Sequence, residues 1–528
     1  MGELWYGGTI YTMETKDCTV EAVFVNHGKI VATGKEKDLR KHYIDEQTVE
    51  YNLQGDVMYP GFVDSHLHIV GHGEKRMRLN LSYYTSVEAL KQSLEQQIRQ
   101  LKNGEWMIGE GWDENQWENP IPIHRRDLDE ISMQHPIVLT RVCRHALVAN
   151  SKALEIAGIT CETEQPQGGK IEKDADGLTG LLLDTAQQYI KDVMPICDRQ
   201  YVEQAITIAI KDLWSNGLVG GHTEDLAYYG SFAKTYQAYL NAIGNSMKFR
   251  THLLVHHNVV DDMQKTKHLH NHPFVEFGAM KIFSDGALGG RTAWLREDYM
   301  DAPGQKGVAI HTKETLSMLV KKARKFQMPV AIHAIGDRAM ELVVDVVSMY
   351  PNNSAMPDRI IHGQIMTERL YPLIANENIV IDIQPTFVAS DFPWVIERIG
   401  INRLAHAYAW KSMLRHGISC AGGSDAPIEE INPLFGIQAA MARTSYHDQV
   451  TYGEEQALSM FEAISLYTTG AAKAIGKQKV RGVIKPNYVA DFTIFDRDLY
   501  TVSPGNLLQV QVSKTVVDGT IMYDIYDG

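Results

Sequence analysis

The sequence lacks long apolar segments and paired cysteines, and each absence argues against a class of protein. No run of residues is apolar enough to cross a membrane as a helix. The first residues, MGELWYGGTIYTMETKD, reach polar positions before an apolar core develops, so we expect no signal peptide. The five cysteines are scattered without a CxxC pair, which argues against a disulfide framework and a zinc–thiolate site. These features favour the reducing cytoplasm as the location.

An excess of basic residues is also missing. The chain has 51 Lys and Arg against 65 Asp and Glu, a formal net charge of −14. Nucleic acid and anionic membranes are not attracted to such a surface, so we expect neither as a partner. Histidine, by contrast, is plentiful at 21 residues, and its placement carries most of the functional argument.

Both ends of the chain show short alternating strands with hairpin turns, and the part between them has a different pattern. A length of 528 residues is too great for one simple core, so at least two domains are expected. Turns such as NHGK and VVDGT fit hairpins. We predict one composite β-sandwich domain from residues 1–55 and 476–528. The pattern leaves two unrelated β modules as the alternative.

Residues 56–475 alternate apolar runs with helical stretches. Runs rich in Val and Ile, such as MPVAIHAIGD and NIVIDIQPTF, suit a parallel sheet that is covered on both faces. Eight such runs, each followed by a helical stretch, predict an α/β fold with a (β/α)8 TIM barrel. An open doubly wound sheet is the alternative that pattern alone leaves.

Residues 80–205 interrupt this alternation after the first barrel strand, because they are too many for a single crossover. Loops that follow the carboxyl ends of barrel strands surround the active site. We therefore expect this insertion to form a lid or wall over a substrate. Structural decoration or an oligomer contact are the alternatives.

The strongest local signal is the pair His66 and His68 in PGFVDSHLH. Alternate residues of a strand point to the same face, so both imidazoles are predicted to point into the barrel mouth. Polar groups at the end of an apolar strand cost desolvation unless something satisfies them. A divalent metal does so well, because neutral imidazole is a good ligand for zinc and related ions.

Other predicted strands carry a polar group in the same region. His333 ends PVAIH, His362 ends RIIH and Asp425 ends ISCAGGSD, while Lys281 lies within the apolar run FGAMKIF. Catalytic residues of barrels gather at the carboxyl ends of the strands. Separately satisfied core histidines would explain one of these residues but explain the whole set poorly.

Weaker candidates surround this set. Trp112 and Asp113 in GEGWDENQW are predicted to shape a substrate pocket, with aromatic packing as the alternative. His145 is predicted to reach the substrate carbonyl, with a structural role as the alternative. Arg291 is predicted to anchor an anion or to order its Gly-rich turn. His222 ends GLVGGH but matches no ligand position, so it is not counted.

With these motifs in place, the chain resembles the amidohydrolase superfamily, in particular the amidohydrolase family 3 branch that includes N-substituted formamide deformylases. The resemblance runs nearly end to end and rests on PGFVDSHLH, GEGWDENQW, GGKIEKDADGLTG, KIFSDGALGGRTA, AIHAIGDRA, IIHGQ, GGSDAP and RGVIKPNYVADFTIFD. It implies a set of metal ligands at matching positions: His66, His68 and Asp425 on one ion, His333 and His362 on a second, and Lys281 between them.

The resemblance also implies that Lys281 is carboxylated by CO2 on its side-chain nitrogen. A carbamate between two cations is better matched than a bare ammonium in an apolar strand. An unmodified Lys281 in a site with one metal is the alternative. The ligand set favours zinc, with one or two ions per chain.

These features predict a metal-dependent amidohydrolase that cleaves a non-peptide C–N bond, such as that of an N-formyl or N-acyl compound. Metal would make hydroxide available near neutral pH, and Asp425 would pass the water's proton to the leaving nitrogen. A one-metal deaminase of a cyclic amidine is the rival, but HAIGDRA lacks the Glu expected beside His333. A non-enzymatic scaffold fits poorly, because every ligand position is retained. We expect a small-molecule substrate and, from the frequency of dimers, a homodimer.

Overall fold

A computed structural model describes residues 2–526 of the chain, apart from residues 113, 115–116, 118–120, 142–145, 167–168, 195–197 and 267–271. The chain forms two compact units, one of residues 1–72 and 202–528 and the other of residues 73–201. Within the described ranges, no helix has both the length and the apolar character that a membrane span requires.

The larger unit contains a sheet of eight parallel strands, which confirms the predicted barrel fold. Each strand lies beside the next one in the sequence, in the order β19-β18-β17-β16-β15-β14-β13-β6. The strands are β6 (Phe62–Leu67), β13 (Leu218–Thr223), β14 (Arg250–His256), β15 (Val275–Phe283), β16 (Val330–Ala334), β17 (Asp358–His362), β18 (Ile379–Ile383) and β19 (Ser419–Gly422).

Two backbone hydrogen bonds join the carboxyl end of the first strand to the segment that follows the last strand. Asp425 N donates to His66 O and His68 N donates to Ala426 O, each at 2.7 Å. Because these bonds connect β6 with the segment after β19, the sheet is nearly closed. They also place the residues after β19 directly beside His66 and His68.

Helices follow the strands, and their sequences show why they form. In α10 (Lys313–Lys325), the buried residues Leu316, Val320 and Ala323 recur at helical spacing, and the Thr312 side chain caps the first turn. The other helices of this region are α8 (Phe232–Ala242), α9 (Val260–Thr266), α11 (Asp337–Met349), α12 (Leu370–Ala375), α13 (Thr386–Asp391), α14 (Trp394–Ile399), α15 (Trp410–Arg415), α16 (Pro433–Ala442), α17 (Met460–Ser465) and α18 (Ala471–Ala474).

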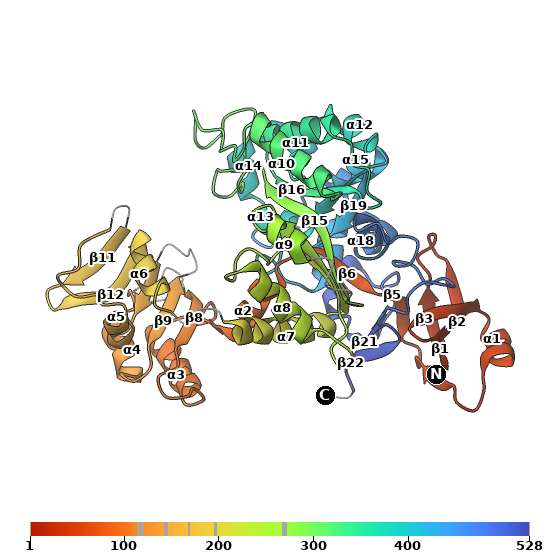
Figure 1. Ribbon diagram of the computed structural model, residues 1–528, viewed down its shortest axis with the longest axis horizontal. Helices are drawn as coiled ribbons and strands as arrows, with labels where there is room; N and C mark the ends of the chain where they lie inside the picture. Colours follow the sequence, from red (N-terminus) through yellow and green to blue (C-terminus); the bar gives the residue numbers. More distant parts are fainter. Residues whose placement is uncertain are drawn as a thin grey trace. The chain divides into compact units, whose positions relative to one another are not determined.

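Strands from both ends of the chain share a second sheet of the larger unit, drawn in red and blue in Figure 1. It includes β5, which the predicted boundary at residue 55 left outside the end domain. The predicted division into end domain and barrel stays a prediction. The strands are β1 (Gly2–Tyr11), β2 (Thr19–Asn26), β3 (Lys29–Gly34), β4 (Val49–Asn52), β5 (Val57–Pro60), β20 (Phe492–Phe495), β21 (Val512–Val517) and β22 (Thr520–Asp524), with α1 (Glu36–Tyr43) after β3.

The smaller unit has its own sheet and its own hydrophobic core. Helices α2 (Ile69–Met77) and α7 (Arg199–Ser215) begin in one unit and end in the other. The other elements are β7 (Leu79–Asn80), β8 (Met107–Trp112), β9 (Ile137–Arg141), β10 (Ala146–Ala149), β11 (Gly169–Asp174), β12 (Gly177–Asp184), α3 (Val87–Ile98), α4 (Arg125–Ile131), α5 (Ser151–Ile156) and α6 (Gln188–Lys191).

Candidate metal centre

His66, His68 and Asp425 form a compact group at the carboxyl end of the barrel. Their ligand atoms lie within 4.8 Å of one another. His66 Nε2 is 3.4 Å and His68 Nε2 is 3.5 Å from the same Asp425 oxygen, Oδ1. The sequence places the histidines on one face of a strand, and the closing bonds of the barrel bring Asp425 to that face.

The remaining predicted ligands extend this group across the barrel. Lys281 Nζ lies 3.3 Å from His66 Nε2, and the rings of His66 and His362 are 5.8 Å apart. His362 Nε2 in turn lies 3.0 Å from His333 Nδ1. The structure therefore brings together the six side chains that were predicted as metal ligands.

Three of the four histidines donate a hydrogen bond outward from one ring nitrogen and turn the other ring nitrogen toward the centre. His68 Nδ1 donates to Glu224 O at 2.7 Å. His362 Nδ1 donates to Gln384 Oε1 at 2.7 Å, and His333 Nε2 donates to Gly286 O at 3.2 Å. The carbonyl oxygens can only accept, so each bond fixes a tautomer.

The pKa values favour neutral imidazoles at most of these positions. Burial and nearby positive charge hold the pKa of His66 and His333 well below the ordinary value. Burial lowers the pKa of His362 to about 4. Burial also lowers the pKa of His68, but the Asp425 carboxylate outweighs it and raises the pKa to about 9. A cation bound between His68 and Asp425 would compete with that proton.

The residues fit a divalent cation. The unprotonated nitrogens of His333 and His362 face each other at 3.0 Å, an unfavourable arrangement that a cation relieves. A carboxylate and several neutral imidazoles converge, which is the donor set that zinc prefers. Outward hydrogen bonds from ligating histidines are typical of metal sites.

Two of these residues have backbone conformations that non-glycine residues rarely adopt. The φ angles are +79° at His362 and +56° at Asp425. Such a conformation costs about 1–3 kcal/mol in general, and it is found preferentially at functional sites. Its presence at two of the predicted ligands agrees with a functional role for this end of the barrel.

Several residues around the centre were missed by the sequence analysis. Asp64 accepts a hydrogen bond from His66 N, and Glu224 accepts one from the Tyr228 hydroxyl at 2.5 Å. The Phe387 ring stacks on His362 at 6.1 Å. Glu224 and Gln384 directly follow β13 and β18, so the strand-end rule that found the histidines could have found them too.

The weaker candidates from the sequence lie in different surroundings. Arg291 donates to both carboxylate oxygens of Asp301, at 3.1 and 2.7 Å. This ion pair leaves both predicted roles of Arg291, the anion anchor and the ordering of its Gly-rich turn, as predictions. Trp112 is 1% exposed and packs in the hydrophobic core of the smaller unit, and its predicted role at a substrate pocket stays a prediction. Asp113 and His145 lie outside the described residues.

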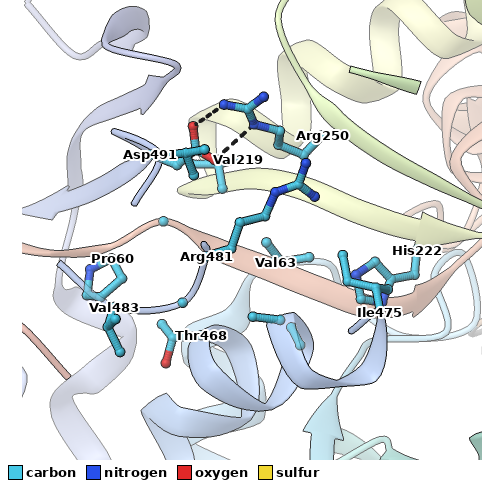
Figure 2. Close-up of a pocket in the computed structure, with 15 residues that line it drawn as sticks. Pro60, Val63, Val219, His222, Arg250, Thr468, Ile475, Arg481, Val483 and Asp491 are labelled. Carbon is cyan, nitrogen blue, oxygen red and sulfur yellow. Dashed lines mark hydrogen bonds and ion pairs between the residues drawn. The ribbon is translucent and has the colours of Figure 1, made fainter. Parts of the chain in front are cut away.

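A separate cavity lies nearer the amino ends of the barrel strands (Figure 2). It is lined by Pro60 and Val63 near the start of β6, by Val219 of β13 and by Arg250 at the start of β14. Arg250 forms a bidentate ion pair with Asp491 there, with both distances at 3.0 Å. His222 lines this cavity as well.

Comparison with known proteins finds a matching family model and similar relatives. The model of the family described as "Amidohydrolase family" matches residues 49–523. A Bacillus subtilis (strain 168) protein that carries the name amidohydrolase YtcJ is 48% identical, over 99% of this chain and 100% of its own. The N-substituted formamide deformylase of Arthrobacter pascens is 24% identical, over 98% of this chain and 97% of its own.

The solved structures include a similar fold of the same length. The crystal structure of an uncharacterized metal-dependent hydrolase from Pyrococcus horikoshii OT3 matches with a TM-score of 0.79 and 26% identity. The match covers 96% of this chain and 99% of that one.

Proposed function

The chain belongs to the amidohydrolase family, and from this premise we propose that it is a metal-dependent hydrolase of a small-molecule amide, such as an N-formyl or N-acyl amine. The observation that carries the proposal is the convergence of His66, His68 and Asp425 at the carboxyl end of the barrel. The similarity to a protein named N-substituted formamide deformylase supports the choice of bond.

We assign the metal-binding roles as follows. His66, His68 and Asp425 hold one ion, and His333 and His362 hold a second. A bound divalent ion, which we expect to be zinc, supplies a water of lowered pKa and polarises the substrate carbonyl. The barrel orients these side chains for metal binding through the outward hydrogen bonds of His68, His333 and His362.

Asp425 is the residue to which we assign proton transfer. Burial raises the pKa of its carboxyl group, but the hydrogen bond from His68 and the charges of His362, His68 and Lys281 outweigh burial and lower it. The carboxylate is therefore ionised near neutral pH. It accepts a proton from the attacking water and returns it to the leaving nitrogen.

We also propose that Lys281 is carboxylated. Its side chain is 1% exposed, and burial lowers the pKa of the amine, which favours the neutral form. A neutral amine forms a carbamate by bonding to the carbon of CO2 and releasing one proton. Incubation with ¹³C-labelled bicarbonate should give a carbamate signal in the NMR spectrum, and the signal should be missing from Lys281→Ala.

The test of the function is a substrate screen of purified, metal-analysed protein. We expect release of free amine from one or more N-formyl or N-acyl amines. Asp425→Asn should keep at least part of its metal and lose about 100-fold or more in kcat, the range for removal of a proton-transfer group. The control is Asp262→Asn, a change at a carboxylate that is 58% exposed and pairs with Lys265 on helix α9.

Two outcomes would contradict the proposal. Release of ammonia from cyclic amidines, with no amide turned over, would identify a deaminase instead. Tight metal binding without turnover of any amide, ester or amidine would point to a scaffold without catalytic activity.

A further inference from the structure

Three consecutive residues after strand β15 contact a single histidine, His333, and the turn that follows it. We name residues 284–286 the β15 clamp. Ser284 bonds to the backbone oxygen of His333 through both its N–H, at 3.0 Å, and its hydroxyl, at 2.5 Å. Gly286 O accepts the hydrogen bond from His333 Nε2. The clamp therefore holds both the main chain and the ring of His333.

Asp285, the middle residue, binds the turn after His333. Its Oδ1 accepts from Ile335 N at 3.1 Å, and its Oδ2 accepts from Gly336 N at 2.8 Å. Oδ2 also accepts from Trp294 N at 2.8 Å, which ties the β15 clamp to the rest of its loop. The carboxylate is fully buried, and these backbone N–H groups replace the water that it loses.

The turn and the loop pack so closely that little movement is available. A Cβ atom added at Gly336 would lie 2.0 Å from Trp294 O. Only glycine permits that approach, so the position of the turn after β16 is closely defined by the loop that Asp285 organises. Because the turn begins two residues after His333, a shift in the turn moves the imidazole.

We propose that Asp285 is a positioning residue, which sets the place of His333 and directs His333 Nδ1 toward the metal centre. This inference rests on the metal-binding role assigned to His333. Asp285 has no assigned contact with substrate or metal, and its Oδ1 lies 3.6 Å from His333 Nε2. Asp285 positions His333 indirectly, through the turn after His333 and through the neighbouring Gly286 O.

The test uses the protein loaded with Co²⁺, whose visible absorption depends on the geometry of its ligands. Asp285→Asn keeps the size of the side chain but removes its charge. We expect the variant to bind one of its ions about 10- to 100-fold more weakly, as is usual when a residue that orients a metal ligand is changed. The cobalt spectrum should change at the same time.

Asp337→Asn is the matched control. Asp337 is also buried, and it also accepts backbone hydrogen bonds from Arg296 N and Arg338 N at 2.9 Å. It joins the same loop to helix α11 but, among the described residues, accepts no hydrogen bond from Ile335 or Gly336 of the turn after His333. We expect this variant to lose thermal stability while its cobalt spectrum and metal affinity stay as in the unchanged protein.

The outcomes separate this inference from the proposed function. Unchanged cobalt affinity and spectrum in Asp285→Asn would overturn the positioning role alone. A wild-type protein that binds no cobalt would overturn the proposed function as well. If Asp285→Asn does not fold, Ser284→Ala decides, because it removes only the hydroxyl bond to His333 O: a changed spectrum supports the β15 clamp, and an unchanged spectrum overturns it.

Discussion

The Asp64 carboxylate holds Ser424, which lies 360 residues further along the chain. It accepts the Ser424 hydroxyl at 2.6 Å and the Ser424 N–H at 3.0 Å, while its other oxygen accepts from His66 N at 2.9 Å. One buried side chain thus links the residues before Asp425 to the first histidine of the centre. This link fixes the relative position of ligands from the first and last barrel strands.

We predict that Asp64→Asn weakens metal binding and activity, although Asp64 touches no substrate. The amide cannot accept all of these hydrogen bonds, so His66 and Asp425 lose their common support. Losing one such charge-assisted bond costs about 1–3 kcal/mol of stability, and kcat/KM should fall about 10- to 100-fold. Metal content, thermal unfolding and kinetics would be measured. Ser424→Ala, which removes only the hydroxyl bond, should give a smaller loss, and wild-type kinetics in both variants would contradict the prediction.

A second prediction concerns removal of metal. A ligand present at about 1,000 times its Kd stabilises the folded state by about 4 kcal/mol. Chelation should therefore lower the melting temperature, and zinc should restore it. His68→Ala serves as the comparison: because it removes one of the assigned ligands, its melting temperature should fall less on chelation than that of the wild type. Identical melting of the wild-type protein in both conditions would argue against a bound metal.

The strand-end pattern anticipated which side chains gather at the carboxyl end of the barrel, because it depends on local rules. Strand periodicity places His66 and His68 on one face, and the order of β16 and β17 in the sheet brings His333 beside His362. The number of apolar runs likewise predicted the barrel, which the structure confirms.

Contacts between distant segments were not predictable in this way. Nothing near Arg291 in the sequence indicates that Asp301 neutralises it, and an aromatic residue such as Trp112 fits a pocket or a core equally well. Asp285 lies within a motif that supported the family resemblance, yet its role depends on a turn 50 residues away. Such roles become visible only when the segments are placed together.

A third prediction concerns Asp391 and pH. Burial raises the pKa of this carboxyl group to about 7, although it accepts hydrogen bonds from Tyr408 Oη at 2.6 Å and Gln364 Nε2 at 2.9 Å. An unfolded chain has an Asp pKa of about 3.9. Between these values the folded state holds a proton that the unfolded state releases. The stability that this group contributes is thus present below about pH 4 and lost as pH rises to about 7.

The measurement is the free energy of unfolding of the wild type relative to Asp391→Asn. We expect the wild type to lose up to about 4 kcal/mol against the variant between pH 4 and pH 8. Asp448→Asn provides a contrast of opposite sign, because the hydrogen bond from Tyr452 lowers the pKa of exposed Asp448. The stability that the Asp448 carboxylate contributes should be lost as pH falls. A pH-independent difference for Asp391→Asn would contradict the assignment.

The final prediction concerns a charge pair inside the barrel. Arg359 Nε donates to Asp382 Oδ2 at 2.7 Å, and Arg359 Nη2 donates to Ser65 O at 2.5 Å. Both charged side chains are at most 1% exposed. Barrel interiors are usually filled by branched apolar side chains, so this pair replaces ordinary packing. Removing one partner leaves the other as a buried and uncompensated charge.

We therefore expect strong coupling between the two positions. Arg359→Met alone should cost about 3–5 kcal/mol, because Asp382 then stays buried without its counter-charge. Asp382→Leu alone should be similarly destabilising. The double variant should be more stable than the sum of the single effects predicts, since two apolar side chains of similar volume can pack where the ion pair was. Urea unfolding of all four proteins measures this coupling. If the effects of the two single variants add, each charge has another compensating partner. The interaction between Arg359 and Asp382 would then contribute nothing of its own to the stability of the barrel.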